Sequence, residues 1–239
     1  MIFLPNNIPE TGFYFDEAKH RYYLDSKQLT GVTTILGVIS KPNLISWASK
    51  MACEYVRENL KNLEELEAVL EKAKNAHAQK RDKAADTGSL THSFCESWIK
   101  AQIGQGEAPQ PQPALSLMTD NFLKWVEEAK PKFLASEKVV YSKELFYAGT
   151  LDFLAEIDGK TYLGDIKTGS GIYPEMWLQT SGYQLALEET EPDLKIDGHI
   201  IVNITKDGKL NVETHYDYET SKQGFLAALT LYRTLNNKL

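Results

Sequence analysis

Three residues near the middle of the chain carry side chains suited to binding a divalent cation. Asp152, Asp165 and Lys167 lie in two mainly apolar runs that are joined by Asp158-Gly159. Such a dipeptide between apolar runs is typical of a two-residue hairpin turn. The register that this turn sets places Asp152 directly opposite Asp165, with Cβ atoms roughly 4.5–5.5 Å apart. Lys167 projects from the same face, because it lies two residues beyond Asp165 on one strand.

Two facing carboxylates repel each other and destabilise a hairpin unless positive charge lies between them. Hard oxygen ligands that converge in this way suit Mg²⁺ or Mn²⁺, with coordination positions left for water and phosphate. A solvent-exposed hairpin face with an Asp–Lys pair is also common in small sheets. From the hairpin alone, therefore, both a metal site and a bare surface remain open.

The elements around this hairpin predict an α/β (α+β) fold with a mixed central sheet flanked by helices. We expect one domain over residues 1–239, with a mainly helical part in 1–130 that starts with an aromatic hairpin, and a catalytic sheet core in 131–239. Apolar periodicity assigns helices and strands within these two parts. The expected helices are one that begins after Lys41-Pro42 and those over 60–83, 86–102, 114–130, 174–189 and 219–235, and the expected strands are 137–145, 148–157, 160–168, 199–205 and 210–216.

Motifs outside the hairpin occur in a recognisable order. Asp152, followed by Asp165-Ile166-Lys167, resembles the signature of the PD-(D/E)XK nuclease superfamily. Gln179–Tyr183 resembles the QxxxY motif of its RecB-like branch, and Gly88–His92 resembles the GxxxH motif of that branch. Leu151 replaces the proline of the signature, a substitution that the branch frequently shows. The overall plan is similar to small phage exonucleases and to the mitochondrial genome maintenance type of exonuclease, which implies a restriction-endonuclease-like core.

The resemblance implies a role for each matching residue. Asp152, Asp165, Lys167 and Gln179 are the expected catalytic residues. His92, Asp152, Asp165 and the carbonyl of Ile166 are the expected ligands of one or two Mg²⁺ or Mn²⁺ ions. In this scheme Lys167 orients the attacking water and neutralises charge on the phosphoryl oxygens.

Other residues are candidates for supporting the metal site or contacting DNA. Some of them have a plain structural alternative: helix packing for Tyr183, a solvated helix acid for Glu96, and a solvated helix face for the basic stretch that includes Lys80. These supporting candidates are Glu96, Glu137, Thr168, Tyr183, Lys80, Arg81 and Lys83. The aromatic residues near the N-terminus, among them Tyr22 and Tyr23, could stack on unpaired bases, but such residues more often belong to a core.

The composition limits the class of protein. The formal net charge of −7 argues against a nucleic-acid coat protein, although an enzyme that acts on DNA remains compatible with it. No apolar run is long enough to span a membrane, and the N-terminus lacks the features of a signal peptide, so we expect a cytoplasmic protein of a bacterial or phage-infected cell. Cys53 and Cys95 cannot form a four-thiolate cluster, so no iron–sulfur cluster is expected, and we expect both thiols to be reduced and buried.

These inferences predict a metal-dependent DNA nuclease, and an exonuclease best fits a chain with no visible sequence-reading domain. The expected partners are single-stranded DNA or duplex ends, together with a single-strand-annealing or recombination protein, in phage or bacterial recombination, repair or DNA processing. The oligomeric state is open. Two alternatives remain: an inactive DNA-binding module on a nuclease fold, and a protein unrelated to nucleic acids whose acidic hairpin is only surface.

Overall fold

The structure is a computed structural model that describes residues 11–110 and 112–237, apart from the side chains of Leu63, Lys83 and Ala84. Its internal contacts define two compact units. The first, here called the sheet unit, comprises Met1–Ile39 and His92–Leu239, and the second, here called the helical unit, comprises Ser40–Thr91. Among the described helices, none combines the length and the apolar character needed to cross a membrane.

A mixed six-stranded sheet forms the centre of the sheet unit, which confirms the predicted fold class. Along the sheet the order is β4-β6-β7-β8-β9, and β5 also pairs with β6. The pairs β4–β6 and β7–β8 are parallel, and the other pairs are antiparallel. The strands are β4 (Thr30–Gly31), β5 (Lys132–Ser142), β6 (Tyr147–Ile157), β7 (Lys160–Lys167), β8 (Gly198–Ile204) and β9 (Leu210–His215).

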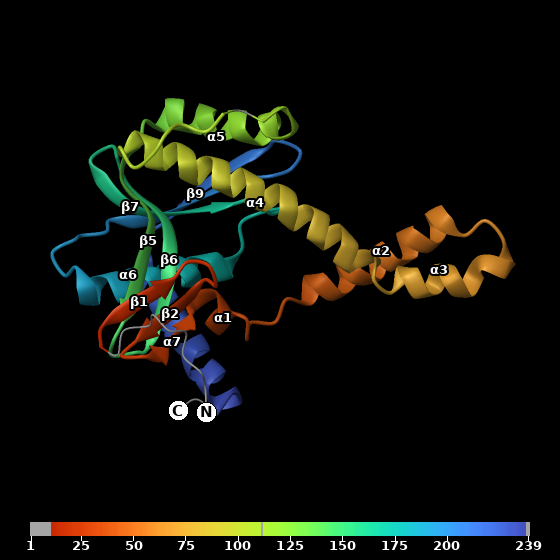
Figure 1. The fold of residues 1–239 in the computed structure, drawn as a ribbon, viewed down its shortest axis with the longest axis horizontal. Helices are drawn as coiled ribbons and strands as arrows, with labels where there is room; N and C mark the ends of the chain where they lie inside the picture. Colours follow the sequence, from red (N-terminus) through yellow and green to blue (C-terminus); the bar gives the residue numbers. More distant parts are fainter. Residues whose placement is uncertain (1–10, 111, 238–239) are drawn as a thin grey trace. The chain divides into compact units, whose positions relative to one another are not determined.

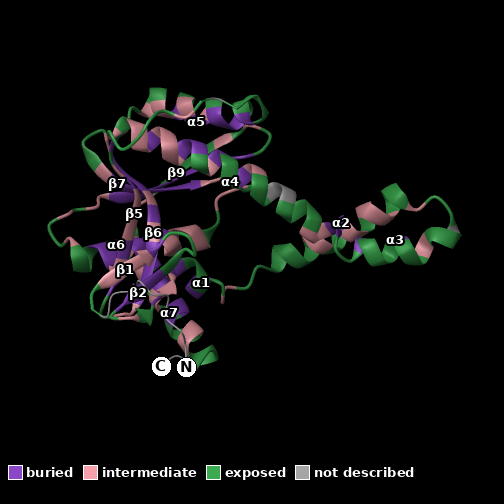
Figure 2. Cartoon of the chain, viewed as in Figure 1, coloured by how far each residue is buried: buried purple, intermediate pink, exposed green. Residues whose placement is uncertain are grey.

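Helices cover both faces of this sheet (Figure 1). One apolar layer joins the sheet to α1 (Val32–Leu36), α6 (Pro174–Thr190) and α7 (Tyr218–Leu235). A second layer joins the opposite face to α5 (Ser116–Ala129) and to the part of α4 (Ala76–Gln102) that carries Phe94, Cys95 and Ile99. Figure 2 shows the buried residues concentrated on the strands between these helices. The sheet is thus held between two helical layers.

A small second sheet near the N-terminus packs against the central one. It consists of β1 (Phe13–Asp16), β2 (Arg21–Leu24) and β3 (Lys27–Gln28) in antiparallel order. Tyr22, Leu24 and Leu29 form an apolar cluster with Ala148 of β6, and the Phe13 ring stacks on the Tyr141 ring with 4.1 Å between centroids. The predicted aromatic hairpin is therefore present, whereas β3, β4 and α1 were not predicted.

The helical unit differs from the prediction in where its helices break. It contains α2 (Pro42–Asn59), a short 3-10 helix (Leu63–Glu65), α3 (Leu66–Ala73) and the first part of α4. The prediction that a helix begins near Asp86 is wrong, because α4 already begins at Ala76. Ala, Gln, Lys and Arg dominate residues 76–84 and favour helix strongly enough to continue through Thr87-Gly88, which resembled a helix start.

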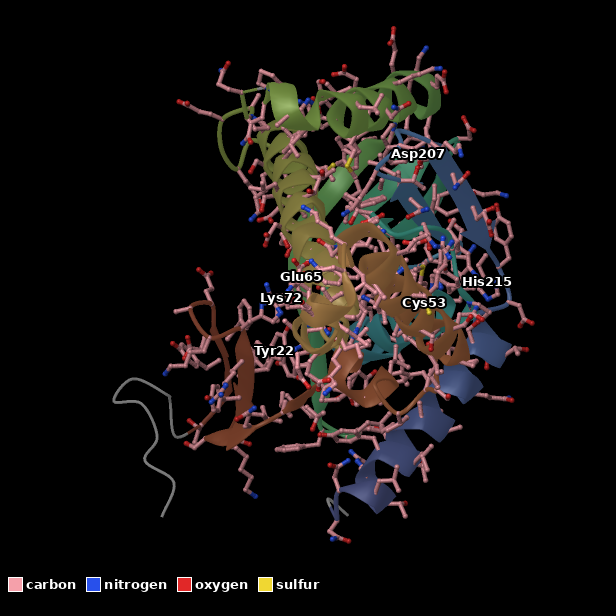
Figure 3. All side chains as sticks on the ribbon, turned by 90° about the vertical axis from the view of Figure 1, so that its right-hand side faces the viewer. Tyr22, Cys53, Glu65, Lys72, Asp207 and His215 are labelled. Carbon is pink, nitrogen blue, oxygen red and sulfur yellow. The ribbon has the colours of Figure 1, made fainter. Side chains whose placement is uncertain are left out.

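The two cysteines lie in different environments. Cys53 is exposed on α2 of the helical unit (Figure 3), so the prediction that both thiols are buried is wrong. Cys95 is completely buried on α4, and its burial, with the nearby charge of Asp152, raises the pKa of the thiol far above its ordinary value. The Cys95 thiol is therefore protonated at any physiological pH.

Candidate metal centre

The predicted hairpin register is confirmed, but the pairing stops one step short of the two aspartates. Residues of β6 and β7 pair from Ile157–Lys160 to Phe153–Gly164. Gly164 is required at this last pair, because a Cβ there would lie 2.0 Å from the Phe153 ring. Asp152 and Asp165 are the next residues, so they lie at the point where the two strands separate.

Strand β6 has a gap on one of its edges beside Asp152. Tyr147 and Ala148 pair with β5 and with β4 at once, so β4 must lie on the edge opposite β5. This is the edge on which β7 pairs farther along, from Phe153 onward. Residues 149–152 therefore face a break between β4 and β7, where no described strand fills the edge. A break of this kind opens the sheet to side chains from both faces.

Asp152 is fixed in this gap by two hydrogen bonds. Its Oδ2 accepts the backbone N–H of Ile166 at 2.6 Å, in place of a strand-pairing bond. The same oxygen lies 2.9 Å from Nε2 of His92, which α4 presents from one face of the sheet. The side chain of Asp152 is 12% exposed and that of His92 is 32% exposed, so both remain accessible to a ligand.

Asp165 belongs to a network that reaches the helix on the other face. Its Oδ2 lies 2.6 Å from Nζ of Lys167, and its Oδ1 accepts a hydrogen bond from Nε2 of Gln179 at 3.1 Å. Gln179 also accepts from Lys167 Nζ at 3.2 Å and donates to the hydroxyl of Tyr183 at 2.8 Å. Three of the four residues predicted as catalytic, Asp165, Lys167 and Gln179, thus form a connected group, with helix α6 supplying the amide.

Burial and mutual repulsion shift the ionisation of these groups. Desolvation, reinforced by the charge of Asp152, raises the pKa of Asp165 to about 6 although Lys167 opposes the shift. Burial alone would lower the pKa of His92, but the hydrogen bond and charge of Asp152 outweigh it and raise the value to about 9. The carboxylates therefore hold a proton on His92, which a cation would have to displace in order to use Nε2 as a ligand.

Two further carboxylates extend the acidic group. Ligand atoms of His92, Glu96 and Glu137 all lie within 4.8 Å of one another. Burial, together with the charges of Asp152 and Glu96, raises the pKa of Glu137 to about 7. Its Oε1 is buried and has no hydrogen-bond partner in the described part of the chain. Glu96 is already engaged by Lys100 in an ion pair. Glu137 therefore has a buried carboxylate oxygen that an added cation or donor could satisfy.

The backbone at Glu137 is unusual for a strand. Its φ of +47° lies in the left-handed region, which costs a residue with a Cβ about 1 kcal/mol or more. The neighbouring pairs Ser136–Phe153 and Lys138–Leu151 place Glu137 opposite Asp152, although these two residues do not pair. The distortion thus lies next to Asp152 and the acidic group, on the edge of β6 opposite the gap.

The donor set fits a hard divalent cation. Asp152 lies 2.9 Å from His92, the ligand atoms of His92, Glu96 and Glu137 lie within 4.8 Å of one another, and Asp165 is close enough to influence the ionisation of His92. Oxygen ligands with one imidazole suit Mg²⁺ or Mn²⁺. Burial is the largest cause of the raised pKa values of Asp165 and Glu137, and the neighbouring charge of Asp152 adds to it, so a bound cation would favour the charged form of both groups.

A cavity of about 290 Å³ opens beside this group. His92, Glu137 and Asp152 line it from the acidic side. The rest of its wall comes from the gap in β6, from the start of α1 and from the N-terminal sheet, whose lining residues include His20, Arg21, Tyr22 and Gln28. The acidic group therefore adjoins a space that a small ligand or part of a polymer can enter.

Several residues of this site were missed by sequence reasoning. Gly149 is one, because a Cβ there would lie 2.4 Å from the Tyr183 ring, so a glycine lets Tyr183 pack beside the gap. Asn203 is another: it pairs with Lys167 in the sheet, and its buried amide has no partner within the described residues. Tyr22 is buried and reaches Thr150 from the N-terminal sheet, which favours the core interpretation of that tyrosine. Of these residues, only Gly149 could have been noticed in the sequence, because it directly precedes Thr150-Leu151-Asp152.

The remaining predicted residues are not part of the connected group. Thr168 is half-buried just beyond the end of β7, and no contact places it at the acidic cluster. Lys80 and Arg81 belong to the helical unit, where Lys80 pairs with Glu54 and Arg81 pairs with Asp82. These pairs favour the alternative of a solvated helix face. The side chain of Lys83 lies outside the described part of the structure.

Comparison with known proteins finds partial structural similarity at low sequence identity. No protein-family model and no curated protein sequence matches the chain. Among solved structures, a candidate exonuclease from Eubacterium rectale aligns with a TM-score of 0.42 at 10% identity, covering 64% of this chain and 69% of its own. An alkaline exonuclease from Laribacter hongkongensis aligns with a TM-score of 0.31 at 13% identity, covering 61% and 83%. A protein named SSO0001 gives 0.32 at 13% identity, covering 77% and 86%.

Proposed function

We propose that the chain is a divalent-metal-dependent nuclease that hydrolyses phosphodiester bonds of DNA, acting as an exonuclease. One observation carries the proposal: two aspartates and a lysine meet at a break in the central sheet, with their side chains held by helices from both faces. Such an arrangement is costly to bury without a ligand, and a bound cation would offset that cost. The signature that Asp152, Asp165 and Lys167 match gives the reaction class.

In this proposal Asp152, Asp165 and His92 hold Mg²⁺ or Mn²⁺, with the Ile166 carbonyl as a further ligand and Glu137 beside them. The bound cation would supply Lewis acidity, which lowers the pKa of water and stabilises charge on phosphoryl oxygens. Lys167 is fixed by Asp165 and by Gln179, so its ammonium group is oriented before substrate arrives. Its role is to position the attacking water and to neutralise charge that develops on the phosphate.

Gln179 and Tyr183 act as positioning residues in this scheme. The Gln179 amide accepts from Lys167 and donates to Asp165, so it fixes the distance between the two. The Tyr183 hydroxyl accepts from the same amide and thereby fixes its orientation. The Tyr183 ring is buried against Gly149, which ties this chain of contacts to strand β6.

The proposal is tested with end-labelled and circular DNA, each single-stranded and double-stranded, in the presence of Mg²⁺, Mn²⁺ or EDTA. We expect metal-dependent degradation of linear DNA that circular DNA resists, and loss of all cleavage in Lys167→Ala. Lys160→Ala is the matched control, because it removes a lysine from the exposed start of the same strand. Equal cleavage by Lys167→Ala would refute the assignment, and metal binding without cleavage by the wild type would favour an inactive DNA-binding module.

A further inference from the structure

The amide of Asn203 is buried near the end of β8 without any hydrogen-bond partner. Among the described residues it is the only side chain in which two buried polar atoms, here Oδ1 and Nδ2, both lack a partner. Such groups are rare in native proteins, because each one lowers the stability of the fold. We therefore expect Asn203 to gain a partner in another state of the protein.

Asn203 lies beside Lys167 on the face of the sheet that meets α6. The two residues are register partners in the parallel pair β7–β8, whose strands are about 4.8 Å apart. Side chains alternate along a strand, and the neighbours Val202 and Ile204 face the layer of α4 and α5. Asn203 therefore faces α6. Lys167 faces the same helix, because its Nζ contacts Gln179.

The missing partner of this amide has to be an internal side chain. The exposed fraction of Asn203 is 0%, so neither a substrate nor a hydrated cation reaches it from solvent. Lys167 is different, because its side chain is 24% exposed and its ammonium group stands on a flexible stem of four carbons. A change of its side-chain torsions can bring this donor to the acceptor on the adjacent strand.

A cation bound by Asp165 would make Lys167 move. Both oxygens of this carboxylate have a partner: Oδ1 accepts from Nε2 of Gln179 at 3.1 Å, and Oδ2 lies 2.6 Å from Nζ of Lys167. A divalent cation competes with the ammonium group for Oδ2 and repels it. Displaced from Oδ2, the ammonium group would keep only the Gln179 oxygen, which is a poor environment for a mainly buried charge.

We propose that Asn203 is a positioning residue that accepts the Lys167 ammonium group when a cation binds Asp165. The ammonium group keeps its contact with Gln179 and exchanges the Asp165 oxygen for Oδ1 of Asn203. It is then held from α6 and from β8, with one N–H left for the attacking water or a phosphoryl oxygen. This inference rests on the proposed nuclease function and adds to it a residue outside the PD-(D/E)XK motifs. Asn203 touches neither cation nor substrate.

Mn²⁺ binding tests this coupling without any need for cleavage. Calorimetric titration of metal-free protein with Mn²⁺ compares wild type, Asn203→Leu, Lys167→Ala and the double variant. Asn203→Leu should weaken binding about 10-fold, because the displaced ammonium group then has no acceptor. In the Lys167→Ala background the same substitution should change the affinity less than about 2-fold, because no ammonium group has to move. Unchanged binding by Asn203→Leu, or equal weakening in both backgrounds, overturns the inference.

Control variants separate this role from a purely structural one. Asn211→Leu is the matched control: Asn211 pairs with Asn203 from β9 but is exposed, so this variant should bind Mn²⁺ like the wild type. Asn203→Asp keeps the shape and an acceptor oxygen, so it should restore binding. Asn203→Ala also lacks the acceptor and replaces the leucine variant if thermal unfolding shows that variant to be unfolded. Weakening by Asn203→Asp or Asn211→Leu as large as that by Asn203→Leu overturns the inference.

Cleavage provides a second measurement. The Mn²⁺ concentration for half-maximal cleavage should rise about 10-fold in Asn203→Leu. KM for DNA at saturating Mn²⁺ should stay within a factor of about 3, because Asn203 does not contact the substrate. If the coupling to Lys167 is found but the wild type cleaves nothing, the inference stands and the proposed hydrolysis fails. If the wild type binds no Mn²⁺, both fail.

Discussion

Two groups of polar side chains meet helix α6 on different parts of its surface, and they differ in charge. The first surrounds Asp165, Lys167 and Gln179 at the gap in the sheet. The second surrounds His199, which is 1% exposed on β8 and lies between α6 and α7. Both are buried and both are connected by hydrogen bonds, so burial alone does not distinguish a functional group from a structural one.

The group around His199 satisfies its own hydrogen bonds without excess charge. Nδ1 of His199 lies 2.9 Å from the Thr180 hydroxyl, and its Nε2 lies 2.7 Å from Oε1 of Gln184. Gln184 continues the chain by donating to Glu188, which also accepts the hydroxyl of Tyr218. Burial, with a small contribution from His215, lowers the pKa of His199 to about 3, so the ring is neutral.

The group at the gap is unsatisfied by comparison. Carboxylates crowd there, the pKa values of Asp165 and Glu137 are raised, and the left-handed backbone at Glu137 adds strain. Buried polar groups whose partners are complete usually serve the fold, whereas uncompensated charge beside a cavity indicates a binding or catalytic site. From this comparison we propose that the His199 group serves stability and that the Asp165 group serves function.

Asp165→Asn should produce the largest effect, a fall in kcat/KM of about 10³-fold. The substitution keeps the shape of the side chain and removes a negative charge that the cation requires. The measurement is cleavage of labelled DNA in Mn²⁺, with a circular dichroism spectrum at 25 °C to establish that the variant is folded. Retained activity in a folded variant would contradict the functional role of the Asp165 group.

His199→Ala should lower the free energy of unfolding by about 3 kcal/mol, because it leaves buried partners unpaired and opens a cavity. Denaturant titration measures this loss. The activity of the folded fraction should stay within a factor of about 3 of the wild type. A large loss of activity with little change in stability would place His199 in the functional group instead.

Addition of Mn²⁺ to EDTA-treated protein should raise the free energy of unfolding by about 2.7 kcal/mol when the free ion is at a hundred times its dissociation constant. The reason is that the native state alone presents the assembled carboxylates. Calorimetric melting of wild type, Asp165→Asn and His199→Gln tests this. Only Asp165→Asn should lose the effect, and its persistence there would show that the ion binds elsewhere.

The pH dependence of stability should reflect His199 with a slope of up to about 1.4 kcal/mol per pH unit. Its pKa is about 3 in the folded state and about 6.5 when unfolded, so below pH 6.5 the unfolded chain binds the extra proton. The stabilisation is complete above pH 6.5 and is lost progressively as the pH falls toward 3. Denaturant midpoints of wild type and His199→Gln between pH 4 and 7 measure it, and parallel profiles would refute this origin.

The sequence predicted the parts of the molecule that depend on local pattern. The Asp158-Gly159 turn set the β6–β7 register, and alternating apolar residues predicted the strands and the helices that cover them. Gln179 and Tyr183 match one motif within one predicted helix, and in the structure the Gln179 amide donates a hydrogen bond to the Tyr183 hydroxyl.

The parts that the sequence did not reveal depend on contacts between distant segments. Strand β4 has two residues, too few for a pattern, and it exists because Thr30 and Gly31 pair with β6 more than a hundred positions later. The gap beside Asp152 follows from that pairing. The left-handed φ of Glu137 and the attachment of Tyr22 to Thr150 likewise have no local signal.

The contrast between the two cysteines makes the protein easy to label. A maleimide dye reacts with thiolate, so it should attach to exposed Cys53 and leave buried Cys95 untouched. A single fluorophore would then be attached to the helical unit without any engineered substitution, outside the sheet unit that carries the proposed metal ligands. Its emission in the presence and absence of DNA would report whether the helical unit takes part in substrate binding.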